Sequence, residues 1–155
     1  MRTDLEGTQA PMDGGAVFEI VTNNPRLTAD FAVSHGIVSV HRVEGSPLDV
    51  LDRAEALLQE GRTLVSAPLP PNVPLMRAPY RSLLLAQSAR RYDAAGLLSI
   101  GKARERLTTQ RAIDEDAGPG RSEDFALIDE DLLCRALRDS RICLDLKEGG
   151  TAPLP

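Results

Sequence analysis

Aromatic residues are scarce in this chain of 155 residues: they make up only 3% of it, and tryptophan is absent. The hydrophobic core must therefore consist mainly of leucine, valine, isoleucine and alanine. Cysteine is rare too, since only Cys134 and Cys143 are present, without a CxxC pair or an accompanying cluster of histidines. A disulfide framework and a zinc site are not expected, and the sequence predicts neither a metal ion nor a cofactor.

Positive charge and long apolar segments are also in short supply. The formal net charge is −5, whereas proteins that bind the phosphate backbone of nucleic acids are usually basic. No apolar stretch is long enough to cross a membrane, and residues 1–15 contain no apolar segment typical of a signal peptide. The sequence therefore predicts a cytoplasmic protein that binds neither nucleic acid nor a membrane.

The length and composition that remain are those of one globular domain. Apolar residues make up 42% of the chain and charged residues 26%, which is ordinary for a soluble protein. We predict a flexible tail over residues 1–15 and a core domain over 16–113. An acidic linker is expected at 114–124. A C-terminal helix, with room for a short closing strand, is expected over 125–146, and a second flexible tail over 147–155.

Four apolar segments of the core domain have the composition of β-strands. They read AVFEIVT, IVSVHRV, RTLVSAP and YRSLLLAQ. Between the second and third, leucines recur at helical spacing and predict a helix over about 47–60. Ser46 is its expected N-cap, Pro47 its first residue and Gly61 its end, and Asp49 completes a near capping box.

Two further helices are expected in the core domain. A short one should follow the first strand, with Asn24 as its N-cap, Pro25 in its first turn and Gly36 at its end. A second long helix is expected over about 94–112, where apolar residues again recur at helical spacing.

The order strand, helix, strand, helix, strand is produced by two right-handed crossovers in a parallel sheet. We therefore predict an α/β fold with a mainly parallel four-stranded sheet, flanked by helices in a Rossmann-like arrangement, and a C-terminal helical extension. The fourth strand has no helix before it. It could pair antiparallel to its neighbours, or cross over through the segment that precedes it.

That preceding segment, residues 68–79, is the proline loop, and it holds five of the eleven prolines of the chain. Each proline fixes φ and lacks an N–H group, so the segment cannot be a helix, and we expect an extended loop. Loops of this length often carry function. The proline loop could be a lid over a ligand or an edge at which a partner protein docks.

Ligands of open α/β sheets bind beyond the carboxyl ends of the strands. Thr22, Asn23 and Asn24 follow the first strand, and Gly45 and Ser46 follow the second. Two interpretations remain open for these residues. The asparagines could contact a ligand or only complete backbone hydrogen bonds, and the helix start at Ser46 could hold a phosphate or carboxylate or only be capped.

Motifs for catalysis are missing from the sequence. It contains no GxSxG, HExxH or GxGxxG pattern and no P-loop lysine, so no catalytic residue is predicted. His35 and His41 could each act as a general base, although a structural role is the simpler interpretation. An enzyme would need a titratable group inside its pocket, and the candidates for that position are Glu44, Tyr80 and His41.

Three separated stretches of the chain resemble the GrdX family: VTNNP, VEGSPLDVLDRAEALLQEGRTLVSAPL and APYRSLLL. Proteins of that family are encoded beside the glycine, sarcosine and betaine reductase systems of anaerobes that ferment amino acids. The resemblance runs from residue 17 to about 107 and fades beyond. The positions that match the family pattern are Thr22, Asn23, Asn24, Pro25, Gly45, Ser46, Pro68, Pro79, Tyr80 and Ser82.

The chain departs from the family pattern in the proline loop and at the residue before it. Ala67 stands where the family tends to have histidine, and Pro70 opens the tripeptide that replaces Ser-Gly-Ser. Pro74 and Leu75 replace Lys-Pro. If the histidine or the lysine of the family carries chemistry, this chain lacks it, which weakens an enzymatic interpretation.

The resemblance implies an accessory or small-ligand-binding protein without catalytic activity, in the setting of reductive amino-acid fermentation. The ligand would be a small carboxylate or phosphate, and a protein of the reductase system would be a partner. The alternatives are a small enzyme acting on such a metabolite at the strand ends, and a protein-interaction module that uses the proline loop. The predicted ligand-binding set is Thr22, Asn23, Asn24, Gly45, Ser46, Pro68, Tyr80 and Ser82.

Overall fold

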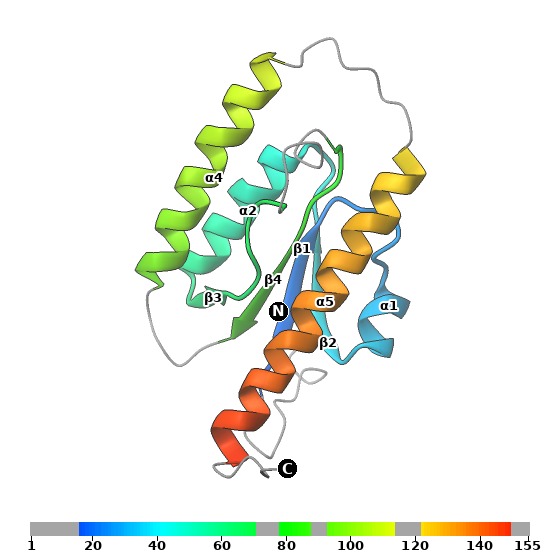
Figure 1. The fold of residues 1–155 in the computed structure, drawn as a ribbon, viewed down its shortest axis with the longest axis vertical. Helices are drawn as coiled ribbons and strands as arrows, with labels where there is room; N and C mark the ends of the chain where they lie inside the picture. The colour runs from blue at the N-terminus through cyan, green and yellow to red at the C-terminus, as the bar shows by residue number, and fades with distance from the viewer. Residues whose placement is uncertain (1–15, 71–77, 88–92, 114–121, 150–155) are drawn as a thin grey trace, which may run out of the picture.

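The computed structural model describes residues 16–70, 78–87, 93–113 and 122–149. Figure 1 shows a sheet with helices α2 and α4 on one side and α1 and α5 on the other. This is the α/β architecture that the sequence predicted. None of the helices within the described residues is long and apolar enough to span a membrane.

The sheet has four strands in the order β2-β1-β4-β3. Their bounds are Phe18–Thr22 for β1, Ile37–Arg42 for β2, Arg62–Leu64 for β3 and Ser82–Gln87 for β4. β1 and β2 are parallel, whereas β4 pairs antiparallel with both β1 and β3. The first three strands therefore run in one direction, but β4 lies between β1 and β3.

The sheet is mixed, so the prediction of a mainly parallel sheet was wrong. The reason lies in the connection before β4. A crossover between parallel strands needs a long connection, usually a helix, and a proline-rich segment stands in its place. The antiparallel pairing that was left open for the fourth strand is the one observed.

Helix α2 spans Pro47–Gln59, as its leucine spacing predicted. Ser46 is its N-cap, and the Ser46 and Asp49 side chains form a reciprocal capping box with each other's backbone N–H groups. Gly61, just beyond the helix, has a φ of +111°, which glycine adopts at no steric cost. The local signals at both ends of α2 therefore agree with the tertiary structure.

Helix α1 spans Ala29–Ser34, and its N-cap is Thr28, not Asn24 as predicted. The Asn24 Oδ1 atom instead accepts a hydrogen bond from the Arg26 N–H group at 2.9 Å, which shapes a turn before the helix. Asparagine serves equally well in such turns and at helix N-caps. The sequence around Pro25 could not distinguish the two.

Helix α4 spans Ala94–Ile113 and α5 spans Ser122–Gly149. Residues 141–146, considered for a short closing strand, are therefore helical. No proline or glycine interrupts the chain between 122 and 148, so nothing local ends the helix earlier. The expected linker at 114–124 differs as well, because α5 includes its last three residues and 114–121 lie outside the described residues.

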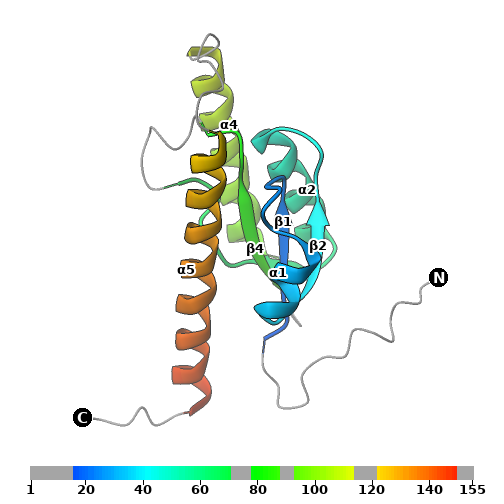
Figure 2. The ribbon, with the colours of Figure 1, turned by 90° about the vertical axis from the view of Figure 1, so that its right-hand side faces the viewer.

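Two hydrophobic cores fill the spaces between the sheet and its helices. Val21, Leu83 and Leu85 point toward α2 and α4, whereas Ile20 and Leu84 point toward α1 and α5. Both central strands are thus covered on both faces, and Figure 2 shows α5 lying alongside β4.

Candidate functional site

The strand ends meet at one edge of the sheet. β1, β2 and β3 all end there, and the antiparallel β4 begins there, so that Thr22 at the end of β1 pairs with Ser82 at the start of β4. The predicted convergence of the segments after β1 and β2 therefore occurs. Residues 78–81 join them, because the chain enters β4 from this edge.

The amide of Asn23 ties three of these segments together. Its Nδ2 donates to the carbonyl oxygens of Gly45 and Pro79 at 2.8 and 2.9 Å. Its Oδ1 accepts from the backbone N–H of Arg81 at 2.8 Å. Three of the four hydrogen bonds that this amide can make are thus committed to backbone groups, and they fix the path of the chain on both sides of Tyr80.

A buried chain of hydrogen bonds joins the same edge to α5. The Asn24 N–H donates to Thr22 Oγ1 at 2.9 Å, and Thr22 Oγ1 lies 2.7 Å from Ser82 Oγ. Ser82 Oγ donates to Asp129 Oδ2 at 2.5 Å. Because the only proton of Ser82 goes to Asp129, Thr22 must be the donor to Ser82. Asn24 Nδ2 also donates to Asp129 Oδ2, at 2.9 Å.

The start of α2 is occupied by its own capping residues. The Asp49 carboxylate accepts from the Ser46 N–H at 2.8 Å and from the Ser46 hydroxyl at 3.1 Å. A Cβ atom at Gly45 would collide with that carboxylate. An anionic ligand would meet this negative charge, so the geometry favours capping for Ser46.

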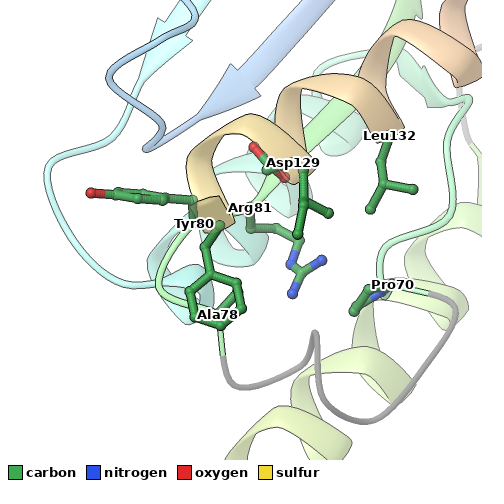
Figure 3. A pocket seen from close by; sticks show the side chains of 8 residues that line it. Pro70, Ala78, Tyr80, Arg81, Asp129 and Leu132 are labelled. Atoms are coloured by element: carbon green, nitrogen blue, oxygen red, sulfur yellow. The ribbon is translucent and has the colours of Figure 1, made fainter. Parts of the chain in front are cut away.

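Beside these networks lies a small pocket, here called the Arg81 pocket, between the segment that enters β4 and the first turns of α5 (Figure 3). Its lining is mostly apolar. The residues that form it are Pro70, Ala78, Tyr80, Arg81, Phe125, Ile128, Asp129 and Leu132.

Arg81 is the unusual member of this lining. The residue is only 4% exposed, yet its Nε and Nη2 atoms have no hydrogen-bond partner among the described residues. Figure 3 shows the guanidinium group pointing into the pocket. Burial lowers the pKa of Arg81, and the negative charge of Asp129 raises it in part. Arginine stays protonated in proteins, so a nearly unpaired positive charge faces the pocket.

Few members of the predicted ligand-binding set reach this pocket. Tyr80 lines it, although Figure 3 shows the hydroxyl pointing away. Thr22, Asn23 and Ser82 hold the segments around it, and Pro68 is half-buried nearby in sequence but is not part of the lining. Of the three titratable candidates, Glu44 and His41 are likewise not in the lining.

Sequence reasoning missed Arg81 as a site residue. The available signal was a charged residue directly before the apolar run Ser82–Gln87, a position that becomes buried when the strand is central. The other half of the pocket could not be predicted from the sequence, because Phe125, Ile128 and Leu132 come from α5. Nothing in their local spacing indicates that they pack beside the entrance to β4.

A second buried charge lies on the α2 side of the sheet, in what is here called the Glu19 cluster: Glu19, His41, Arg62 and Gln87. Glu19 Oε1 lies 2.6 Å from His41 Nε2, and its Oε2 accepts from Gln87 Nε2 at 2.6 Å and from Arg62 Nε at 3.3 Å. Every strand of the sheet contributes one member. The cluster is a cross-strand network inside the fold, which explains where His41 points.

Hydrogen bonding decides the protonation state of Glu19. Burial alone would raise its pKa, but the hydrogen bonds from His41 and Gln87 and the positive charge of Arg62 outweigh burial. The pKa falls from 4.5 to about 2. Glu19 is therefore ionised at neutral pH and fully engaged by its neighbours.

The described residues contain no group of three or more histidine, cysteine or acidic side chains that could hold a metal ion. Chemically, the Arg81 pocket offers anion binding by a fixed guanidinium in apolar surroundings. Nucleophilic catalysis would need a nucleophile with an adjacent base, and the lining supplies only the outward-pointing Tyr80 hydroxyl and the hydrogen-bonded Asp129.

Comparisons with known proteins give one result. The family described as GrdX-like protein matches residues 19–138, a range that runs from β1 into α5 and includes all residues that line the Arg81 pocket. None of the curated proteins and none of the solved structures matches the chain.

Proposed function

We propose that this chain, which belongs to the GrdX-like protein family, is a small-ligand-binding accessory protein without catalytic activity. Its ligand is a small anion that binds in the Arg81 pocket. The observation that carries this proposal is the buried guanidinium of Arg81, whose Nε and Nη2 atoms lack partners among the described residues.

An unpaired buried charge is costly. Removing an ion from water costs several kcal/mol even after the protein relaxes, and native proteins leave few buried polar atoms without partners. Asp129 lowers this cost only in part, because its Oδ2 atom is already hydrogen-bonded to Ser82 and Asn24. An anion in the pocket would supply the missing partner.

Asn23 and Ser82, which belong to the ligand-binding set predicted from the sequence, hold the segments that form the pocket. Asn23 holds the backbone of Pro79 and Arg81, and Ser82 is tied to Asp129 on α5. A binding group works best when its neighbours fix its position. We propose that most of the predicted ligand-binding set positions Arg81, while Tyr80 borders the ligand directly.

The resemblance to the GrdX family supports a setting in reductive amino-acid fermentation, with a cytoplasmic location and a protein of a glycine-type reductase system as a partner. This setting is a separate part of the proposal. The genes that neighbour the coding sequence test it, since a glycine, sarcosine or betaine reductase operon should stand beside it.

The two other interpretations of the sequence draw less support from the fold. An enzyme needs a titratable group that faces the ligand, and Tyr80, the only candidate in the lining, points its hydroxyl away. A protein-interaction module would rest on the proline loop, of which residues 71–77 lie outside the described residues.

A thermal-shift screen tests the proposal. The panel contains glycine, betaine, small monocarboxylic acids, acetyl phosphate and nucleotides, because a ligand of the folded state raises the melting temperature by mass action. At least one small anion should raise it, and the shift should disappear in Arg81→Met. Arg53→Met, at an exposed position on α2, is the matched control and should keep it. A panel without any shift that depends on Arg81 would contradict the proposal.

A further inference from the structure

We infer that the anion is the carboxylate of a small monoacid that also carries an apolar group. This inference rests on the proposed function and adds the chemical class of the ligand. It follows from three properties of the Arg81 pocket: the geometry of the free N–H groups, the chemistry and size of the lining, and the charge of Asp129.

The free N–H groups form a matched pair. Nε and Nη2 are the two nitrogens whose N–H bonds lie side by side along one edge of the guanidinium, and these are the two without partners among the described residues. Two parallel donors fit the two oxygens of a carboxylate in a bidentate contact. A single lone acceptor, such as a carbonyl or a hydroxyl, would satisfy only one of them.

The lining around the guanidinium is apolar. Phe125, Ile128 and Leu132 cover it from α5, and Pro70 and Ala78 from the other side. These surfaces favour a ligand that places methyl or methylene groups beside its carboxylate. A fully polar anion would leave the same surfaces without a partner.

The size of the pocket limits the ligand. The enclosed part of the space has room for about one water molecule, and the rest is open to solvent. Pockets for drug-sized ligands measure roughly 300–1,000 Å³. The Arg81 pocket therefore suits a molecule of a few heavy atoms that lies partly in the open mouth.

The charge of Asp129 favours a monoanion. Asp129 is 6% exposed and lies close enough to Arg81 to raise its pKa, so its negative charge already offsets part of the positive charge that a ligand would meet. A carboxylate adds one negative charge to this pair, whereas a phosphate dianion adds two in surroundings of low dielectric constant, where like charges repel strongly. A small monocarboxylate should bind more tightly than inorganic phosphate.

NMR titration of the full-length protein with a matched ligand series tests this inference. Propionate has the carboxylate and the apolar group, propionamide has the same shape without the charge, and inorganic phosphate has the charge without the apolar group. Propionate should perturb the Arg81 side-chain Nε–H signal and bind at least tenfold more tightly than propionamide or phosphate. N-acetylalanylalanine presents the carboxylate of a chain end and should bind more weakly than propionate, because the pocket is small.

Two variants complete the design. Arg81→Lys keeps the charge but loses the paired donors, so propionate affinity should fall at least tenfold, whereas Arg53→Met should leave it unchanged. Tighter binding of phosphate or of the peptide, lost in Arg81→Lys, would overturn the monoacid inference and leave the proposed function standing. If propionate and the wider panel all fail to bind in a manner that depends on Arg81, both the inference and the proposed function are overturned.

Discussion

Glu19 and Arg81 are both charged and both buried, since the two residues are 1% and 4% exposed, but the fold treats them in opposite ways. Glu19 receives hydrogen bonds or a charged contact from every other strand of the sheet. Arg81 keeps two N–H groups without partners among the described residues. A fold that can satisfy one buried charge completely does not need to leave another unsatisfied, so the difference points to a function for Arg81.

Among the substitutions that distinguish the Glu19 cluster from the Arg81 pocket, Glu19→Ala should cause the largest loss in the free energy of unfolding. This substitution removes the buried carboxylate that accepts hydrogen bonds from Gln87 and Arg62, and breaking a buried charge network costs about 3–5 kcal/mol of the free energy of unfolding. Urea denaturation measures the loss. Glu60→Ala is the control, since Glu60 also pairs with Arg62, at 3.0 Å, but is 58% exposed, and such surface pairs contribute about 0–1 kcal/mol. Equal losses in the two variants would contradict the structural role of Glu19.

Lowering the pH should weaken the same Glu19 interactions without any substitution, because it protonates the Glu19 carboxylate. The pKa of Glu19 is about 2 in the folded protein against 4.5 ordinarily. Since the folded value is the lower one, the stabilisation is fully present above about pH 5 and is lost as the pH falls toward 2, with a contribution of order 3 kcal/mol. The free energy of unfolding can be measured by denaturation at a series of pH values from about 6 to about 2. It should depend less on pH in Glu19→Gln than in the wild type. Parallel pH profiles of the two proteins would sink this assignment.

The Asn23 amide extends the comparison to the edge of the sheet. Asn23→Ala removes three hydrogen bonds to the Gly45, Pro79 and Arg81 backbone, and should lower the free energy of unfolding by about 2 kcal/mol. It should also reduce the ligand-induced thermal shift, because Arg81 is no longer held in place. Gln59→Ala, at an exposed position near the end of α2, should stay within about 0.5 kcal/mol of the wild type. An unaltered ligand shift in Asn23→Ala would show that this amide does not position the site.

Local sequence signals predicted the parts of the fold that local interactions decide. The capping box at Ser46 and the leucine spacing of α2 are complete within the helix itself, and the prediction of α2 is confirmed. Asn24 is the opposite case, since its side chain bonds to Asp129 and Ala126 on α5. Because those partners lie more than a hundred positions away, no local pattern could separate an N-cap from a tertiary anchor.

The sheet and the pocket depended on the same distant contacts. The direction of β1, β2 and β3 was predicted, but the insertion of β4 between β1 and β3 follows from strand pairing, which no single segment encodes. The Arg81 pocket needs α5 to lie against the entrance to β4. The sequence was sufficient to predict the edge of the sheet at which the site lies. The burial of Arg81 at that edge depends on tertiary packing, which the sequence alone did not reveal.

The stability of Arg81→Met, measured in buffer free of small acids, tests the central claim most directly. If Arg81 is held unpaired for a ligand, an apolar side chain of similar volume should raise the free energy of unfolding by about 1–2 kcal/mol and abolish the thermal shift with propionate. A fall in the free energy of unfolding, together with an unchanged propionate shift, would show that Arg81 serves the fold and not a ligand.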